Sequence, residues 1–154
     1  MTDTSSDSGS DPGSDPGSDP GSGPSASPAD VEQGTRFLPK LDSEGLIGAV
    51  VTDYDTGTVL MFAWMNEEAL KRTFETGTVH FWSRSRRRLW KKGEESGNTL
   101  GVREARIDCD QDMLWIRADV AGAGVACHTG AHSCFYRTIS AGADGALVLT
   151  RDEI

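Results

Sequence analysis

The sequence predicts an α+β fold with mostly antiparallel strands and one main helix, in a compact single domain. Three observations lead to this prediction. Short apolar runs alternate with turn residues along most of the chain, as in strands that are joined by hairpins. Only residues 66–77 carry a helical pattern with recognisable signals at both ends. The length of 154 residues suffices for one domain and some excess.

The excess lies at the N-terminus. Residues 1–30 contain no Lys, Arg, aromatic, Leu or Ile, and the tetrapeptide GSDP occurs three times in a row. We expect residues 1–34 to form a disordered acidic tail rich in Gly, Ser, Asp and Pro, and residues 35–154 to form the folded domain. Of the net charge of -9, six Asp in residues 1–30 carry -6, so the domain itself is only mildly acidic.

Six strands are predicted from apolar runs. They are a run ending at Val51 and residues 59–65, 79–83, 102–108, 113–120 and 146–150. The turn sequence DTG between the first two indicates a β-hairpin. A polar loop is expected after the third, and the sequence CDQD joins the fourth to the fifth.

The helix is predicted from its ends and from its apolar spacing. Asn66 is a suitable N-cap, and Gly77 stands where a left-handed residue commonly ends a helix. Leu70 and Phe74 are four residues apart, so we expect them on the same face.

Two features bear on the cellular compartment. The chain has no run of 18 apolar residues and no basic N-terminal stretch followed by an apolar one, so we expect a cytoplasmic protein that does not bind a membrane. Three cysteines, an odd number, argue against a disulfide framework and for metal ligands or nucleophiles.

Three carboxylates and one of these thiols lie within five positions. If residues 108–112 are extended, Asp108, Asp110 and Asp112 share one face while Cys109 points to the other. Oxygen donors of this kind suit Mg²⁺ or Mn²⁺. A solvated acidic hairpin tip without a metal explains the same pattern.

The other two thiols, Cys127 and Cys134, are interleaved with His128 and His132. This spacing is wider than the CxxC of a structural zinc site. Together with Cys109 they could hold three corners of a Zn²⁺ tetrahedron and leave the fourth to water, as in catalytic zinc sites. His128 is then a candidate general base, although a ligand or core role for a histidine remains an alternative.

Residues 80–98 concentrate positive charge in an otherwise acidic chain. Six Arg and Lys side chains stand there among serines, glycines and two tryptophans, which is a composition suited to phosphate oxygens and a stacked base. The candidate substrate contacts are Trp82, Ser83, Arg84, Ser85, Lys92, Gly93 and Ser96. One basic cluster in a net-negative domain is a poor footprint for nucleic acid, so a small phosphorylated metabolite is the expected partner.

Four motifs together resemble the phosphoribosyl-AMP cyclohydrolase family of histidine biosynthesis. They are MFAWMN (61–66), HFWSRSRRRLWKKGEESGN (80–98), DCDQD (108–112) and CHTGAHSCFYR (127–137). The resemblance implies a hydrolase that opens the adenine ring of N1-(5-phosphoribosyl)-AMP at the N1–C6 bond. It implies one Zn²⁺ per subunit on the three cysteines and Mg²⁺ on the three aspartates. It also implies an intertwined homodimer, in which Cys109 of one subunit meets Cys127 and Cys134 of the other.

Some relatives carry a second domain that hydrolyses phosphoribosyl-ATP. Only 17 residues follow Arg137, so we expect the single activity. Two alternatives stay open. A zinc-dependent nucleotide deaminase would share the metal chemistry, but its HxE and PCxxC signature is absent. A non-enzymatic zinc-binding module would hold a saturated site with four ligands.

Overall fold

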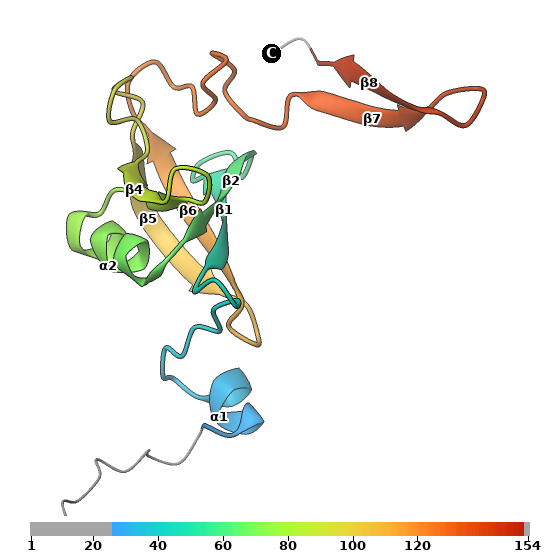
Figure 1. The fold of residues 1–154 in the computed structure, drawn as a ribbon. Helices are drawn as coiled ribbons and strands as arrows, with labels where there is room; N and C mark the ends of the chain where they lie inside the picture. Colours follow the sequence, from blue (N-terminus) through green and yellow to red (C-terminus); the bar gives the residue numbers. More distant parts are fainter. Residues whose placement is uncertain (1–25, 153–154) are drawn as a thin grey trace, which may run out of the picture.

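The computed structural model describes residues 26–152, and within them two helices and eight strands. The elements in chain order are α1 (Pro28–Gln33), β1 (Ile47–Asp53), β2 (Val59–Met65), α2 (Glu67–Thr76), β3 (His80–Ser83), β4 (Arg88–Lys91), β5 (Leu100–Ile107), β6 (Met113–Val120), β7 (Arg137–Ala141) and β8 (Leu147–Arg151) (Figure 1). The predicted tail over residues 1–25 lies outside the described residues.

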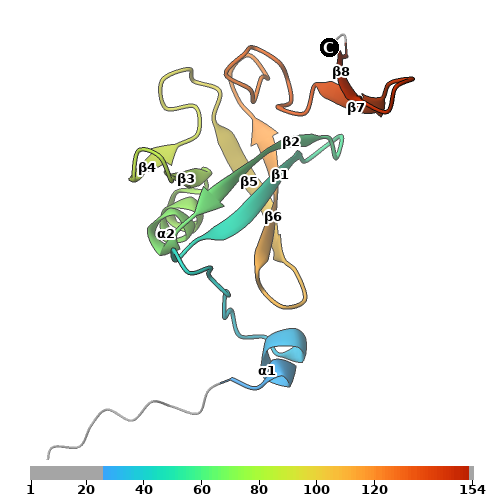
Figure 2. The same ribbon diagram turned by 45° about the vertical axis from the view of Figure 1, so that its right-hand side comes forward.

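A four-stranded sheet in the order β2-β1-β6-β5 forms the body of the fold. The pairs β1–β2 and β5–β6 are antiparallel, and β1–β6 is parallel. β3–β4 and β7–β8 are separate antiparallel hairpins (Figure 2). The predicted α+β class with mostly antiparallel pairing is therefore confirmed.

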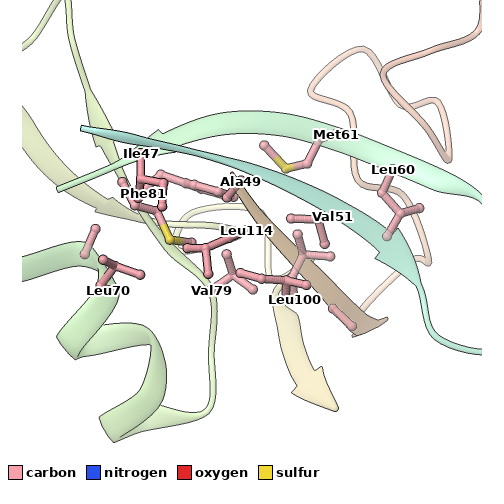
Figure 3. Close-up of a cluster of buried hydrophobic side chains, with 14 of the residues drawn as sticks. Ile47, Ala49, Val51, Leu60, Met61, Leu70, Val79, Phe81, Leu100 and Leu114 are labelled. Carbon is pink, nitrogen blue, oxygen red and sulfur yellow. The ribbon is translucent and has the colours of Figure 1, made fainter. Parts of the chain in front are cut away.

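The hydrophobic core lies between one face of this sheet and the layer formed by α2 and the β3–β4 hairpin (Figure 3). Alternate residues of β1, namely Ile47, Ala49 and Val51, point into it, as the two-residue period of a strand requires. Phe81 from β3 and Leu70 from α2 pack against them. The opposite side of the sheet is its outer face.

The predicted helix is confirmed as α2. The side chain of Asn66 accepts a hydrogen bond from the amide of Ala69 at 2.9 Å, and Gly77 ends the helix at φ +66°. Both residues lie in α2, four positions apart as expected. Leu70 is buried, but Phe74 is 54% exposed, and the helix also buries Thr73.

Three elements were not predicted. β4 replaces the expected polar loop, because its charged residues pair with β3 and its Trp90 ring packs 5.0 Å from that of Phe81. α1 lies in the expected tail and begins with a capping box between Ser27 and Asp30. β7 pairs with the predicted last strand.

The β7–β8 hairpin projects away from the rest of the subunit in both views (Figures 1 and 2). All of its strand residues are exposed. Neither described helix is long and apolar enough to cross a membrane.

Candidate functional site

The main candidate site is a cavity of about 510 Å³ at one end of the four-stranded sheet. Its walls come from β4, from the segment that follows β4, and from the loop between β6 and β7. The ionisable residues that line it are Cys127, Cys134, His128, Arg86, Arg88, Lys91, Lys92, Glu94 and Glu95, so four Arg and Lys residues outnumber the two carboxylates. A space of this size holds a small organic ligand, and the cationic side chains favour an anionic one.

Backbone hydrogen bonds fold the β6–β7 loop around the two cysteines. The amide of Cys127 donates to the carbonyl of Ala131 at 3.1 Å, and the amide of Gly130 donates to the carbonyl of Cys127, also at 3.1 Å. Cys134 is held separately, since its amide donates to the carbonyl of Leu60 in β2 at 2.7 Å. The two thiols are thereby brought within hydrogen-bonding reach of each other.

The two thiols differ in acidity. Burial alone would raise the pKa of Cys127, but the hydroxyl of Thr129, 3.0 Å from the sulfur, and the backbone amide of Thr129 outweigh it and lower the pKa. Desolvation, together with the hydrogen-bonded Cys127, raises the pKa of Cys134 to about 11. A soft metal ion that displaces the remaining proton would bind both sulfurs.

Lys92 brings a positive charge to the same wall and is only 9% exposed. Burial lowers the pKa of its ammonium group, and the two thiols act in the opposite direction. Gly93 follows at φ +79°, where a Cβ would lie 2.3 Å from the carbonyl carbon and oxygen of Asn98. Only glycine fits the sharp bend that turns the chain back at this wall.

The two histidines of the loop have different surroundings. His128 is exposed and lines the cavity beside the thiols. Nδ1 of His132 instead donates to the carbonyl of Gly124 at 2.6 Å, and its Nε2 lies 3.9 Å from a carboxylate oxygen of Asp53. His132 therefore braces the loop, whereas His128 faces the space that a ligand would occupy.

The aspartates lie in the tight turn between β5 and β6. The expectation of an extended segment is wrong, because Gln111 adopts φ +60° and the chain reverses there. Asp108 Oδ1 accepts hydrogen bonds from the amides of Asp112 at 2.9 Å and of Met113 at 3.1 Å. The turn still gathers oxygens of all three carboxylates within 4.8 Å of one another.

This cluster of aspartates carries unbalanced negative charge. The carboxylate of Asp110 is the main cause that raises the pKa of Asp112. Lys40 Nζ lies 3.5 Å from Asp110 and offsets part of the repulsion. A divalent cation would offset more of it.

Gln111 also connects this turn to the N-terminal segment. Its buried side chain accepts a hydrogen bond from the amide of Leu38 at 2.7 Å. It donates to the carbonyls of Val31 at 3.0 Å and of Arg36 at 3.2 Å. Nothing in the local sequence pattern indicated this role.

Cys109 stands apart from the other two cysteines. It lies in the β5–β6 turn, at the opposite end of the sheet from the loop that carries Cys127 and Cys134 (Figure 2). The eight residues of β6 separate the two ends by about 26 Å, at roughly 3.3 Å per residue. Within residues 26–152, the aspartate trio is the one cluster with metal-ligand geometry, so a single subunit does not assemble the three cysteines.

The predicted substrate contacts divide into two groups. Lys92, Gly93 and Ser96 line the cavity with the cysteines. Trp82 and Arg84 line a separate hollow of about 290 Å³, and Ser83 Oγ accepts a hydrogen bond from a backbone amide of the β3–β4 turn at 3.3 Å. Ser85 is exposed in that turn.

Several cavity residues were not among the candidate substrate contacts. Arg86, Arg88 and Trp90, which the sequence placed in the basic segment, line the cavity because β4 pairs with β3 and turns one side of that segment toward the thiols. Thr129 was missed as the donor to Cys127. A hydroxyl two residues from a candidate metal ligand is the sequence signal that could have indicated it.

Comparison with known proteins gives a consistent result. The sequence model of the family described as phosphoribosyl-AMP cyclohydrolase matches residues 61–136. This range includes the cavity walls, the aspartate turn and all three cysteines.

Individual relatives extend the similarity over most of the chain. A phosphoribosyl-AMP cyclohydrolase of Sinorhizobium medicae is 57% identical over 126 residues, which are 81% of this chain and 83% of the relative. A protein of the same name from Brucella canis is 57% identical over 123 residues, or 79% of this chain and 88% of the relative. One from Rhodopseudomonas palustris is 58% identical over 120 residues, or 78% and 79% of the two chains.

Proposed function

The chain belongs to the phosphoribosyl-AMP cyclohydrolase family, and from that premise we propose that it hydrolyses the adenine ring of 1-(5-phosphoribosyl)-AMP in histidine biosynthesis. Water adds to C6 and the N1–C6 bond breaks. The water oxygen becomes the carboxamide oxygen, N1 takes up a proton, and the product is the formimino-aminoimidazole carboxamide ribonucleotide. The observation that carries the proposal is the cavity in which two thiols, an imidazole and a set of cationic side chains meet.

The substrate gives each part of this cavity a function. Alkylation at N1 leaves the purine ring electron-poor, so that C6 accepts a nucleophile. Two phosphate groups account for the basic walls, where Lys92, Gly93 and Ser96 would bind phosphate oxygens. Binding of the remote phosphates would also orient C6 toward the reacting groups. The roles of Trp82, Ser83, Arg84 and Ser85 as substrate contacts remain predictions, since they lie outside the cavity.

The sulfur chemistry of the site fits a zinc ion. Cys127 and Cys134 lie close enough to shift each other's pKa, and the pKa of Cys127 is already lowered. With Cys109 they would hold Zn²⁺ through three thiolates. The bound metal would act as a Lewis acid that makes water nucleophilic near neutral pH. His128, on the same wall, would accept the proton that the attacking water loses.

The separation of Cys109 from its two partners supports a homodimer. One subunit keeps these ligands at opposite ends of β6, so the zinc site requires Cys109 of the partner subunit. Two-fold symmetry then creates two equivalent sites, with one Zn²⁺ per subunit. The carboxylates of Asp108, Asp110 and Asp112 would hold Mg²⁺ beside each site.

The deciding experiment is a spectrophotometric assay of the purified protein with phosphoribosyl-AMP, with and without chelator, Zn²⁺ and Mg²⁺. We expect ring opening that chelator abolishes and the metals restore. Ammonia is assayed in the same samples, since its release would identify a deaminase. Absence of turnover in zinc-loaded protein would favour a non-enzymatic zinc module. A cytoplasmic location, where the nucleotide substrate is made, belongs to the same proposal.

A further inference from the structure

The β7–β8 hairpin has one apolar face and one polar face. Residues that are paired across the two strands lie on the same side, and alternate pairs lie on opposite sides. The apolar side carries Ile139, Ala141, Leu147 and Leu149, with the pair Arg137 and Arg151 at its base, and the polar side carries Thr138, Ser140 and Thr150 together with Val148. This alternation is typical of a hairpin whose apolar side is buried.

No other described part of the subunit covers that apolar side. Ile139 is 66% exposed, Leu147 is 77% exposed and Leu149 is 59% exposed. An isolated two-stranded hairpin is only marginally stable in water, because it leaves its apolar side chains hydrated. The hairpin therefore needs a second surface.

The outer face of the four-stranded sheet carries an apolar band, bordered by Arg106 and Arg117, whose guanidinium carbons lie 5.8 and 5.9 Å from the centre of the Trp115 ring. Val50 of β1 lies between Phe62 of β2 and Trp115 of β6 in the strand register, and Met113 continues the band. Phe62 and Trp115 are exposed, and among residues 26–152 no element packs over this face. A shallow hollow of about 460 Å³ lies along it beside Met113 and Trp115.

Gly48 shows how tightly the band is packed. A Cβ at this position would lie 2.9 Å from side-chain atoms of both Met113 and Phe62. Because Gly48 has no side chain, those of Met113 and Phe62 approach each other across β1 and form a continuous apolar surface. An apolar surface of this kind that is exposed to solvent is typical of an interaction site.

We propose that the apolar side of the β7–β8 hairpin of one subunit packs on the outer face of the sheet of a second copy, reciprocally. We choose a second copy of the chain as the partner because the proposed zinc site already brings two subunits together, so this inference rests on the proposed function. The hairpin begins at Arg137, three residues or at most about 10 Å of chain after Cys134. If Cys134 shares a metal with Cys109 of the partner subunit, the hairpin starts beside the partner's β5–β6 turn.

From that turn the hairpin reaches the outer face directly. Met113, the first residue of β6, follows Cys109 by four residues and begins the apolar band. The five-residue strands of the hairpin are about 17 Å long, which is enough to pass over Met113 and Trp115. In a dimer with one two-fold axis, the apolar side of each hairpin and the outer face of each sheet would then be buried, and the zinc site of each subunit would be complete.

Charge supports the same placement. Arg137 and Arg151 are paired at the base of the hairpin, the end nearest Cys134. The β5–β6 turn that would face them carries three carboxylates. Opposite charges at this point would fix the orientation of the hairpin on its partner.

Photo-cross-linking of the full-length, metal-loaded protein tests the proposal. Benzoyl-phenylalanine replaces Leu149 in unlabelled chains, which are mixed and refolded with heavy-nitrogen-labelled wild-type chains. Mass spectrometry should find cross-links from position 149 of an unlabelled chain to Val50, Met113 or Trp115 of a labelled chain. The same group at Ser140, on the polar side, should give none of these. Cross-links confined to one chain, or directed to another surface, would overturn the proposal.

Sedimentation equilibrium of two matched variants gives a second test. Leu149→Asp should weaken the dimer by about 100-fold or more, because two-fold symmetry places the buried charge in both halves of the interface. Ser140→Asp introduces the same charge one strand pair away on the polar side and should leave the dimer unchanged. Equal dissociation of both variants, or of neither, would contradict the assignment.

The two proposals can fail separately. Hydrolysis of phosphoribosyl-AMP without the expected cross-links would leave the activity in place and remove only the hairpin interface. Cross-links without hydrolysis would leave the interface in place and remove the activity.

Discussion

The hydroxyl of Thr129 donates a hydrogen bond to the sulfur of Cys127 at 3.0 Å, and this contact helps to lower the pKa of that thiol. Thr129→Val keeps the shape of the side chain and removes the donor. The pKa of Cys127 should then rise, so the proton competes with the metal up to a higher pH. We expect zinc affinity at pH 7 to fall by about 10-fold, measured by competition with a chromogenic chelator.

Thr129→Ser is the matched control, because it keeps the hydroxyl and should retain zinc affinity. In Thr129→Val the pH midpoint of zinc binding should move upward, since the thiolate is the ligand and it forms at higher pH. A midpoint that stays fixed, or moves downward, would show that the hydroxyl does not act on this thiol.

Mixing experiments test whether the zinc site is shared between subunits. Cys109→Ser and Cys134→Ser proteins should each be inactive and bind little zinc. After random reassortment half of the dimers are mixed, and each mixed dimer has one intact site of two. Activity and bound zinc should therefore both recover to about a quarter of the wild-type values.

The control for this experiment is a mixture of Cys127→Ser with Cys134→Ser. These residues belong to the same subunit's half of the site, so each site of a mixed dimer lacks one ligand. No activity should return. Recovery in this mixture, or none in the first, would contradict a site that takes Cys109 from one subunit and the other two cysteines from its partner.

Asp110→Asn should have opposite effects on stability and on activity. The carboxylate of Asp110 is the main cause of the raised pKa of Asp112, so removing it relieves repulsion in the metal-free protein. We expect a higher unfolding temperature without Mg²⁺, a smaller stabilisation by added Mg²⁺, and a lower kcat. Calorimetry with and without Mg²⁺ and the hydrolysis assay measure these changes.

The pH dependence of this effect has a definite sign. A carboxyl group whose pKa is raised in the folded state stabilises the fold at low pH relative to high pH, and this contribution is lost as pH rises through the raised pKa. The higher unfolding temperature of Asp110→Asn should therefore be present at neutral pH and should shrink as the pH falls through the raised pKa of Asp112. If Asp110→Asn still unfolds at a higher temperature than the wild type at low pH, the stabilisation has a cause other than relief of the repulsion between Asp110 and Asp112.

The elements that the sequence predicted well are those with local signals. Asn66 and Gly77 mark both ends of α2, and strong apolar runs mark the strands of the main sheet. β4 could not be predicted, because Arg88 and Lys91 at its ends are charged and pairing with β3 is what makes the segment a strand. The parallel pairing of β1 with β6 has no local signal either, since it joins residues that are 65 positions apart in the chain.

The candidate site likewise has features with a local sequence signal and features that depend on long-range strand pairing. Cys127 and Cys134 could be paired from the sequence because one short loop holds both. The aspartates could be grouped, although the geometry behind the grouping was wrong: the turn at Gln111, and not an extended strand, brings them together. That Cys109 lies at the other end of β6 depends on the whole topology of the sheet, which the residues alone do not specify.

Gly93→Ala should distort the cavity. The position has φ +79°, and the new Cβ would meet the carbonyl group of Asn98 at 2.3 Å, so the backbone must move. We expect a loss of about 2–4 kcal/mol in unfolding free energy and a raised KM. Gly57→Ala is the matched control, because Gly57 has φ +73° but nothing within 4 Å of the added atom. It should cost only about 1 kcal/mol and leave KM unchanged.

Gln111→Ala should detach the N-terminal segment from the β5–β6 turn. The variant loses three hydrogen bonds, to Leu38, Val31 and Arg36, and leaves an alanine at φ +60°. At about 1 kcal/mol for each bond, the fold should lose about 2–3 kcal/mol. Hydrogen exchange should show faster exchange of the Leu38 amide, whose acceptor is gone.

Gln33→Ala is the control for this variant, because Gln33 is an exposed residue of α1 and makes no side-chain hydrogen bond among the contacts of the described residues. It should leave both stability and exchange at Leu38 unchanged. The turn also carries Cys109 and the aspartates, so Gln111→Ala should weaken Mg²⁺ binding even though Gln111 is no ligand. Unchanged exchange at Leu38 in Gln111→Ala would show that the segment is held by other contacts, and that the buried amide does not fix the turn that presents the metal ligands.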